Sequence, residues 1–233
     1  MKTKKEKAFL KLCKEISNCE ICKNINFTPH LTEKNCFIPA PKSKNPNYVN
    51  LWNRVQGSLN ADIMVIGQDY GVFEEKVFPT DSKLIELFNN PLGISIDKKN
   101  PRVFLTNIAN CYRNHTSTGT LNKGCLALCA NKFMSRLIKI ISPKIIITLG
   151  QDTFNALACC DGAKIVCNNP YEQKSDSNFK TIIERDYSFI LDGEQEIALF
   201  PVYHPGASGR RNRTDEEQFR DWEKIANYLK KGI

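Results

Sequence analysis

Lys144-Ile-Ile-Ile-Thr-Leu-Gly150 is the best apolar run of the chain, and Ala61-Asp-Ile-Met-Val-Ile-Gly67 has the same form. Both runs are short, rich in aliphatic residues and closed by glycine, which is typical of a buried parallel strand. Residues 103–108 and 197–203 are two further strands of this kind. Helical patterns separate the strands, and their expected ranges are 81–90 (with Asp81 as N-cap), 122–141, 152–158 and 214–231.

Strands that alternate with helices predict an α/β fold of three layers, α/β/α, around a central, mostly parallel four-stranded sheet. No linker or internal repeat divides the chain, so we expect one domain over residues 1–233. An amphipathic helix at 3–16 precedes a segment, 18–46, in which Cys, Asn, Pro and Lys dominate. Such a segment needs an external cross-link, such as a bound metal, to become ordered. Residues 160–196 are expected to contain a hairpin around Asp192-Gly193.

Composition narrows the class of protein. Thirty-three Lys and Arg against 25 Asp and Glu leave a net charge of +8, which suits either a partner with many phosphates or solubility alone. The chain contains no apolar run of the ~20 residues that a membrane span needs, and no apolar signal core follows the charged N-terminus. We therefore expect a cytoplasmic protein. In a reducing compartment, its ten cysteines favour a metal or cluster over disulfides.

Three polar residues end predicted strands, where ligands bind to open parallel sheets. Asp69 follows the first strand within Gly67-Gln-Asp-Tyr-Gly71, and can orient water or stabilise a cation, or merely cap the next helix. Asn107 offers a donor and an acceptor to the edge of a base, or serves as a turn residue.

His204 ends the fourth strand, where its N–H can reach a developing oxyanion or can be bonded for packing alone. A glycine-rich and then basic stretch follows, with arginines at 210, 211 and 213. We interpret this stretch as a loop that contacts phosphates or enters a groove, with a solvated surface loop as the alternative.

The cysteines fall into pairs. Cys19 and Cys22 form a C-x2-C pair, which is spaced to hold one metal or cluster. Cys111 and Cys129 form a wider pair, and Cys125 is an alternative partner to Cys111. Two such pairs could join the N-terminal segment to the α/β body through a four-thiolate site. We interpret the remaining thiols as small buried hydrophobes or spare thiols, at positions Cys13, Cys36, Cys159, Cys160 and Cys167.

In its order of motifs the chain resembles the uracil-DNA glycosylase superfamily, especially the branch with a four-cysteine iron–sulfur cluster. The resemblance covers roughly residues 15–230. It rests on the following motifs, in this order: Cys19/Cys22, Gly67-Gln-Asp-Tyr-Gly71, Asn107-Ile-Ala-Asn-Cys111, Cys129, Pro143-Lys-Ile-Ile-Ile-Thr-Leu-Gly150 and His204-Pro205-Gly206.

The chain also departs from that branch. Gly67-Gln68-Asp69 is closer to the first motif of the cluster-free enzymes, and Tyr70 stands where those enzymes have proline. Tyr112-Arg113-Asn114 replaces an Arg-Pro-Pro. Cys129 lies about one residue further from the Pro143 strand than the family spacing, which keeps Cys125 open as a ligand. Hypoxanthine or xanthine therefore remains an alternative substrate base.

The resemblance implies a monomeric hydrolase that removes uracil from DNA. Asp69 and His204 would be catalytic, and the cysteines would hold a structural [4Fe–4S] cluster. Other implied roles concern contacts with the base, from Gly67, Gln68, Tyr70, Asn107 and Phe78 (or Phe73), and contacts with DNA, from Arg210, Arg211 and Arg213. Two alternatives stay open: a member that binds uracil or damaged DNA without cutting it, and an unrelated protein whose thiolates bind zinc.

Overall fold

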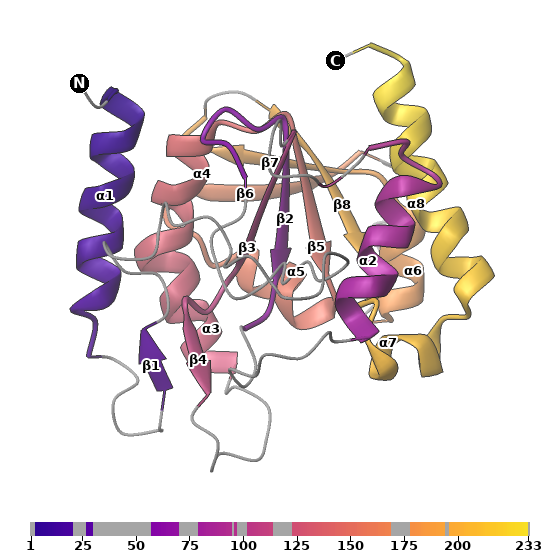
Figure 1. Cartoon of the computed structure of the whole chain (residues 1–233), viewed down its shortest axis with the longest axis horizontal. Coiled ribbons are helices and arrows are strands. Elements are labelled where there is room, and N and C mark those ends of the chain that lie inside the picture. Colours follow the sequence, from indigo (N-terminus) through magenta and orange to yellow (C-terminus); the bar gives the residue numbers. More distant parts are fainter. Residues whose placement is uncertain are drawn as a thin grey trace, which may run out of the picture.

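The computed structural model describes residues 3–20, 27–29, 57–69, 79–94, 96, 102–113, 123–168, 178–193 and 196–232. These residues form a sheet between two layers of helices (Figure 1). In spatial order its strands are β3 (Val103–Asn107), β2 (Ile63–Gly67), β5 (Ile145–Leu149), β8 (Glu196–Val202), β7 (Tyr187–Leu191) and β6 (Ala163–Cys167).

The sheet confirms the predicted fold class and corrects its size. The four predicted strands, β2, β3, β5 and β8, pair in parallel and form one half of the sheet. The prediction of only four strands was wrong, because β7 and β6 extend the sheet with antiparallel pairs. The expected hairpin is present: Asp192 and Gly193 join β7 to β8 with φ of 52° and 71°. An isolated hairpin is only marginally stable. This one is supported on both sides, because β8 also pairs with β5 and β7 also pairs with β6.

Alternate residues of each central strand pack against different helices. Met64, Ile66 and Phe104 belong to one core cluster, and Ile63 and Val65 belong to the other. The first cluster is completed by α1 (Lys4–Ser17), α3 (Lys123–Cys129), α4 (Ser135–Ile141), α5 (Gln151–Leu157) and α6 (Phe179–Glu184). The second is completed by α2 (Pro79–Asn89) and α8 (Asp215–Lys230), with Trp222 of α8 fully buried against Phe88.

Helix α2 begins earlier than predicted. Pro79 is its first residue, and Asp81, which the sequence favoured as the N-cap, lies inside the first turn. Proline suits the first helical position, because its fixed φ fits the helix and the N–H it lacks would be unpaired there anyway.

The long helix predicted over 122–141 is present but is not a regular α-helix throughout. A π-helical turn, Ala130–Met134, separates α3 from α4. The helix ends where Ser142 takes a left-handed conformation before Pro143, as the sequence predicted. Single π-turns of this kind are often found near functional sites.

The stretch after His204 was predicted as a loop and is instead a short helix, α7 (Ala207–Asn212). Helix α8 follows at once. Its N-cap is Thr214, whose hydroxyl accepts from the N–H of Glu217 at 3.2 Å while the Glu217 carboxylate accepts from the N–H of Thr214 at 2.8 Å. This capping box fixes the point at which the chain turns from α7 into α8.

The N-terminal helix is tied firmly to the body. The ammonium of Lys5 donates to the carbonyls of Leu59 and Ile141, each at 3.1 Å. The guanidinium of Arg136 donates to the Glu15 carboxylate through both of its Nη atoms and thereby lowers the pKa of that carboxyl group.

A separate two-stranded ribbon is formed by β1 (Phe27–Pro29) and β4 (Cys111–Arg113). Within the described ranges, no helix combines the length and apolarity needed to cross a membrane.

Candidate active site

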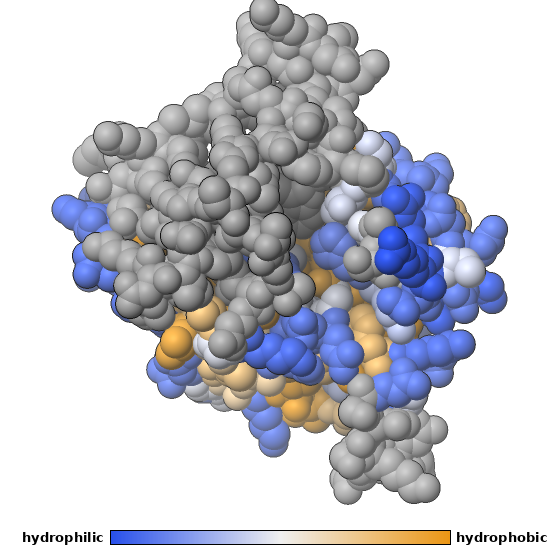
Figure 2. Space-filling model, turned by 90° about the horizontal axis from the view of Figure 1, so that it is seen from below, coloured by the Kyte–Doolittle hydropathy of each residue, from blue (hydrophilic) through white to orange (hydrophobic). Residues whose placement is uncertain are grey.

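Asp69, Asn107 and His204 lie at the carboxyl edge of the parallel strands. Strand β3 lies on one side of β2 and β5 on the other, so the order in which the strands are added to the sheet reverses between β2 and β5. Such a switch point is where open α/β sheets bind ligands. Figure 2 views the molecule from this edge, where apolar surface emerges among hydrophilic residues.

Asp69 and His204 follow the two strands that flank β5. Asp69 lies two residues beyond β2, and His204 lies two residues beyond β8. The negative charge of Asp69 acts to raise the pKa of His204. Gly150 directly follows β5 between them, and a Cβ at this position would make only an ordinary contact, 3.8 Å, with the Cβ of His204. The φ of 93° at Gly150, and not crowding, is what favours glycine there.

The imidazole of His204 is neutral and has a defined tautomer. Burial lowers its pKa below the usual value of 6.5, and the charge of Asp69 offsets this effect only in part. The Nδ1 atom accepts a hydrogen bond from the N–H of Gly206 at 3.0 Å. Because Nδ1 is an acceptor, the ring proton belongs on Nε2. His204 thus presents a neutral N–H donor.

Two glycines of the following segment make this arrangement possible. A Cβ on Gly206 would lie 2.8 Å from both the His204 Nδ1 and the Thr80 hydroxyl. A Cβ on Gly209 would overlap the backbone carbonyl of His204. The glycines of this segment are plain in the sequence, but the packing of α7 directly on the histidine was not predicted, nor was the position of Thr80 of α2 beside it.

We expect Gly209→Ala to destabilise the fold by about 1–3 kcal/mol, because the new methyl group meets backbone that cannot rotate away. The change in unfolding free energy can be measured by denaturant titration. Arg211→Ala, on the exposed side of the same helix, is the control and should have little effect. Equal stabilities of Gly209→Ala and the parent chain would mean that α7 does not press on His204.

Asn107 ends strand β3 and provides an unused donor. Its side chain is 1% exposed, and among the described residues its Nδ2 atom has no hydrogen-bond partner. Gly67 lies opposite Asn107 in the ladder, and the carbonyl of Gln68 accepts from the N–H of Ala109 at 2.9 Å. Buried amides without a partner are costly, so this one is poised for a ligand. Tyr70, Phe73 and Phe78, the predicted neighbours of the base, lie outside the described residues.

The three arginines differ in their surroundings. Arg211 is exposed and Arg210 is half-buried, both on α7. Arg213 is buried and donates to Asp221 from Nε at 3.0 Å and from Nη2 at 2.6 Å. We therefore retain Arg210 and Arg211 as candidate contacts to DNA and set Arg213 aside as part of an internal ion pair.

Three cysteines lie near one another and are called the cysteine corner below: Cys19, which follows α1, and Cys125 and Cys129 of α3. Cys129 is buried, and the thiols of Cys19 and Cys125 are close enough to act on its ionisation; together with burial they raise its pKa to about 11. The backbone of Asn110 bonds to this thiol, and Cys111 follows it at the start of β4. Cys22 falls outside the described residues, and within them no group of three or more His, Cys, Asp or Glu residues could hold a metal ion.

The π-turn bears on which cysteine faces this corner. A π-turn takes up one more residue than an α-turn while leaving the helices on either side in phase. It lies between Cys129 and Pro143, the interval in which the chain has about one residue more than the family spacing. The extra residue is thus accommodated locally, so the spacing to Pro143 does not count against Cys129.

Comparison with known proteins is consistent with this geometry. The type-4 uracil-DNA glycosylase of Sulfurisphaera tokodaii is 28% identical over 160 residues, which are 66% of this chain and 63% of that protein. The type-4 uracil-DNA glycosylase of Saccharolobus solfataricus is also 28% identical, over 158 residues, 66% of this chain and 64% of that protein. The chain thus matches slightly less than two thirds of the length of these relatives.

A profile of the uracil DNA glycosylase superfamily matches residues 55–230. This span includes the whole parallel sheet and the segments that carry Asp69, Asn107 and His204. With most of its length matched, the chain belongs to the uracil DNA glycosylase superfamily.

Proposed function

We propose that this protein hydrolyses the N-glycosidic bond that joins uracil to DNA. The observation that carries the proposal is the half-buried His204, whose Nδ1 accepts from the N–H of Gly206 and whose ring lies within reach of the charge of Asp69 at the carboxyl edge of the sheet. The two relatives named type-4 uracil-DNA glycosylases support the choice of base.

The two groups match the two charges of the reaction. When the glycosidic bond breaks, the sugar becomes a cation and the uracil leaves as an anion. The Nε2–H of His204 donates to the anionic oxygen of the base without first having to lose a charge. Asp69 stabilises the cationic sugar and orients the attacking water. Each such contribution typically accelerates a reaction by ~10²–10³-fold.

The remaining predicted contacts select the base. Asn107 supplies its unpartnered amide donor to the carbonyl edge of a flipped uracil. The backbone at Gly67 and Gln68, which lies beside Asn107 in the sheet, holds the other carbonyl. We assign the stacking role to Phe78 and a lining role to Tyr70, as the family resemblance implies.

The direct test is an excision assay with single- and double-stranded oligonucleotides that contain one uracil, one hypoxanthine or only normal bases. We expect strand breakage after alkali only where uracil is present. Cleavage of hypoxanthine alone would change the substrate assignment. Tight binding of uracil-containing DNA without cleavage would instead identify a recognition module.

We propose that Cys19, Cys22, Cys111 and Cys129 hold a structural [4Fe–4S] cluster, as the family resemblance implies, and the proximity of Cys19 to Cys129 supports this choice. A thiol whose pKa is raised to about 11 by burial and by neighbouring thiols stays protonated unless a cation stabilises the thiolate. A cluster held by these cysteines would cross-link the N-terminal segment to the α/β body and would take no part in hydrolysis. Zinc is the alternative, and the broad visible absorbance of anaerobically purified protein distinguishes the two metals.

The half-buried Arg210 and exposed Arg211 are proposed to grip DNA beside the flipped base. Replacing both with alanine should weaken binding and reduce the slope of log K against log salt by about 0.7–0.9 for each phosphate that the protein no longer neutralises. Duplex substrates should lose more activity than single strands, because only a duplex must be unpaired and unstacked.

Lys230→Ala/Lys231→Ala is the matched control, since it removes the same charge at the opposite end of α8 (Figure 1). The control should leave the salt slope unchanged. If the two double variants behave alike, net charge and not a local grip explains the binding. Equal losses on single- and double-stranded DNA would leave the phosphate contacts in place but remove the role in opening the duplex.

A further inference from the structure

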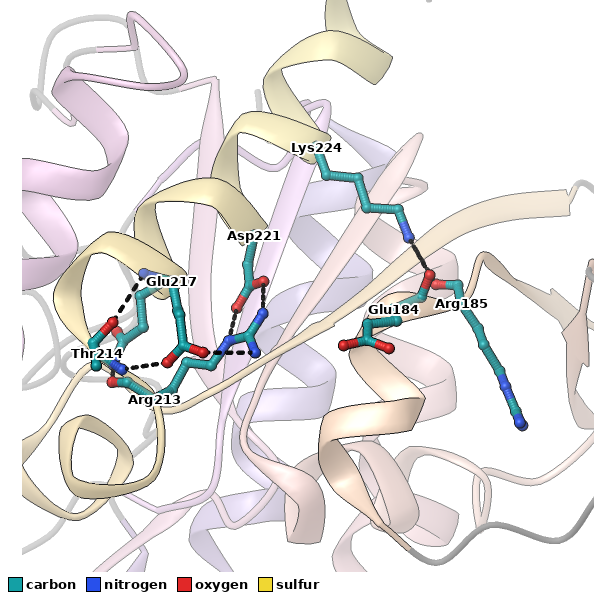
Figure 3. Close-up of polar contacts among 8 residues, drawn as sticks. Glu184, Arg185, Arg213, Thr214, Glu217, Asp221 and Lys224 are labelled. Carbon is teal, nitrogen blue, oxygen red and sulfur yellow. Dashed lines mark hydrogen bonds and ion pairs between the residues drawn. The ribbon is translucent and has the colours of Figure 1, made fainter.

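Arg213 is the hub of an ion-pair network at the junction of α7 and α8 (Figure 3). Its guanidinium donates to both oxygens of Asp221, and Nη1 lies 3.5 Å from Glu217. The side chains of Arg213 and Asp221 are 10% and 11% exposed. Each of the three guanidinium nitrogens faces a carboxylate, so this side chain is committed to α8.

The backbone of Arg213 connects the same network to His204. The N–H of Arg213 donates to the carbonyl of Gly209 at 3.0 Å, and Gly209 packs against the carbonyl of His204. One turn earlier, Gly206 donates to the Nδ1 of His204. Helix α7 is therefore held at its end by Arg213 and touches the histidine at its beginning and middle.

Helix α8 is a rigid anchor for this clamp. Trp222 and Ile225 are fully buried in the core. Gln218, which is 1% exposed, donates from Nε2 to the carbonyl of Arg213 at 3.1 Å. The end of α7 is thus fixed to α8 through both the side chain and the backbone of one residue.

We propose that Arg213 is a positioning residue, whose fork on Asp221 holds α7 against His204 and so fixes the imidazole at the end of β8. Its effect on turnover rests on the proposed function, whereas its effect on the histidine does not. Lysine cannot replace it, because a single ammonium lacks the planar fork that engages two carboxylate oxygens.

Lys224 provides a matched control on the same helix. Its ammonium donates to the carbonyl of Arg185 at 2.9 Å and pairs with Asp186 at 2.7 Å. These contacts tie α8 to the end of α6, on the other side of the network in Figure 3. Removing Lys224 therefore breaks a cation's contacts between α8 and the end of α6 and removes no hydrogen bond or ion pair to α7.

The experiment compares Arg213→Ala and Lys224→Ala at temperatures where both are folded. The chain has three histidines, so NMR of the imidazole groups can follow the titration of His204 in the absence of DNA. In Arg213→Ala we expect the pKa of His204 to move up toward its usual value as the site loosens. We expect kcat for uracil excision to fall about 10- to 100-fold while KM changes less than about threefold. Lys224→Ala should leave both readouts unchanged.

An unchanged titration of His204 in Arg213→Ala would overturn the proposal, whether or not the protein cleaves uracil. A shifted titration in a protein that cleaves no uracil would support the positioning role and count against the proposed function alone. If Arg213→Ala does not fold, Arg213→Lys and Asp221→Asn serve in its place, and both should shift the titration of His204. If Lys224→Ala shifts it equally, general loosening of α8 explains the result and the proposal is wrong.

Discussion

Replacing Asp69 with asparagine should lower the single-turnover rate of uracil excision by at least ~10²-fold and leave the affinity for DNA nearly unchanged. The carboxylate stabilises the positive charge that the sugar gains and orients the water that attacks it, and both effects matter only along the reaction. In the ground-state complex the sugar carries no such charge. The amide has nearly the same shape as the carboxylate, so the substitution tests charge rather than packing.

The same substitution has a second expected consequence, on His204. The negative charge of Asp69 raises the pKa of this histidine, so its removal should lower that pKa further. The imidazole then remains neutral down to a lower pH. A slower reaction in Asp69→Asn therefore cannot result from protonation of His204, and an NMR titration of the imidazole can verify the direction.

Asp62→Asn is the matched control for Asp69→Asn. Asp62 immediately precedes the same strand, β2, at its opposite end, and its carboxylate makes a surface pair with Arg102 at 3.5 Å. We expect this variant to cleave uracil at the parent rate. If Asp69→Asn also cleaves at the parent rate, Asp69 has no part in the chemistry and the stabilisation of the sugar must come from elsewhere.

The parallel part of the fold, and the placement of Asp69 and His204 at one edge of it, could be predicted from local patterns. Each central strand is an apolar run, and in a parallel sheet the carboxyl ends of all such runs share one edge. That rule alone brings together two residues that are 135 positions apart in the chain. Strand β6 was missed because its residues are only half-buried or exposed, which leaves no apolar run to recognise.

The role of Arg213 could not be read from the segment that contains it. Arg210, Arg211 and Arg213 form one basic stretch, and nothing in that stretch tells them apart. What separates them is the start of α8, which places Glu217 and Asp221 four and eight residues beyond Arg213, on the helix face toward it. The acidic residues at this spacing were the available signal, since i,i+4 pairs are close on a helix surface.

The π-turn also left a trace in the sequence. Pairs of buried residues recur every four positions along this helix, at Cys129/Ala130, Phe133/Met134 and Leu137/Ile138. An α-helix has 3.6 residues per turn, so a four-residue repeat drifts around it by about 40° per turn. One π-turn corrects the drift and keeps the apolar side on the sheet.

The proposed cluster predicts that Cys129→Ser loses bound iron, whereas Cys160→Ser keeps it. The two residues are closely matched: Cys129 is 6% exposed, Cys160 is 4% exposed, and both thiols belong to the same core cluster. Burial raises the pKa of both, to about 11 and about 12. The difference is in their neighbours, because Cys129 shares a corner with Cys19, while Cys160 lies beside Cys159 at the end of α5.

Both substitutions bury a hydroxyl in place of a thiol and should carry a similar packing cost, so the iron content separates a ligand from a filler. We expect Cys129→Ser also to lower the unfolding temperature more than Cys160→Ser, since loss of the cluster removes the cross-link to the N-terminal segment.

A third variant, Cys125→Ser, tests the alternative ligand. Cys125 lies one turn before Cys129 on the same face of α3 and is only partly buried. If Cys125→Ser loses iron and Cys129→Ser retains it, the fourth ligand is Cys125, and the π-turn does not serve to place a ligand. If all three variants retain full iron, the cluster is not held by the cysteines of this corner.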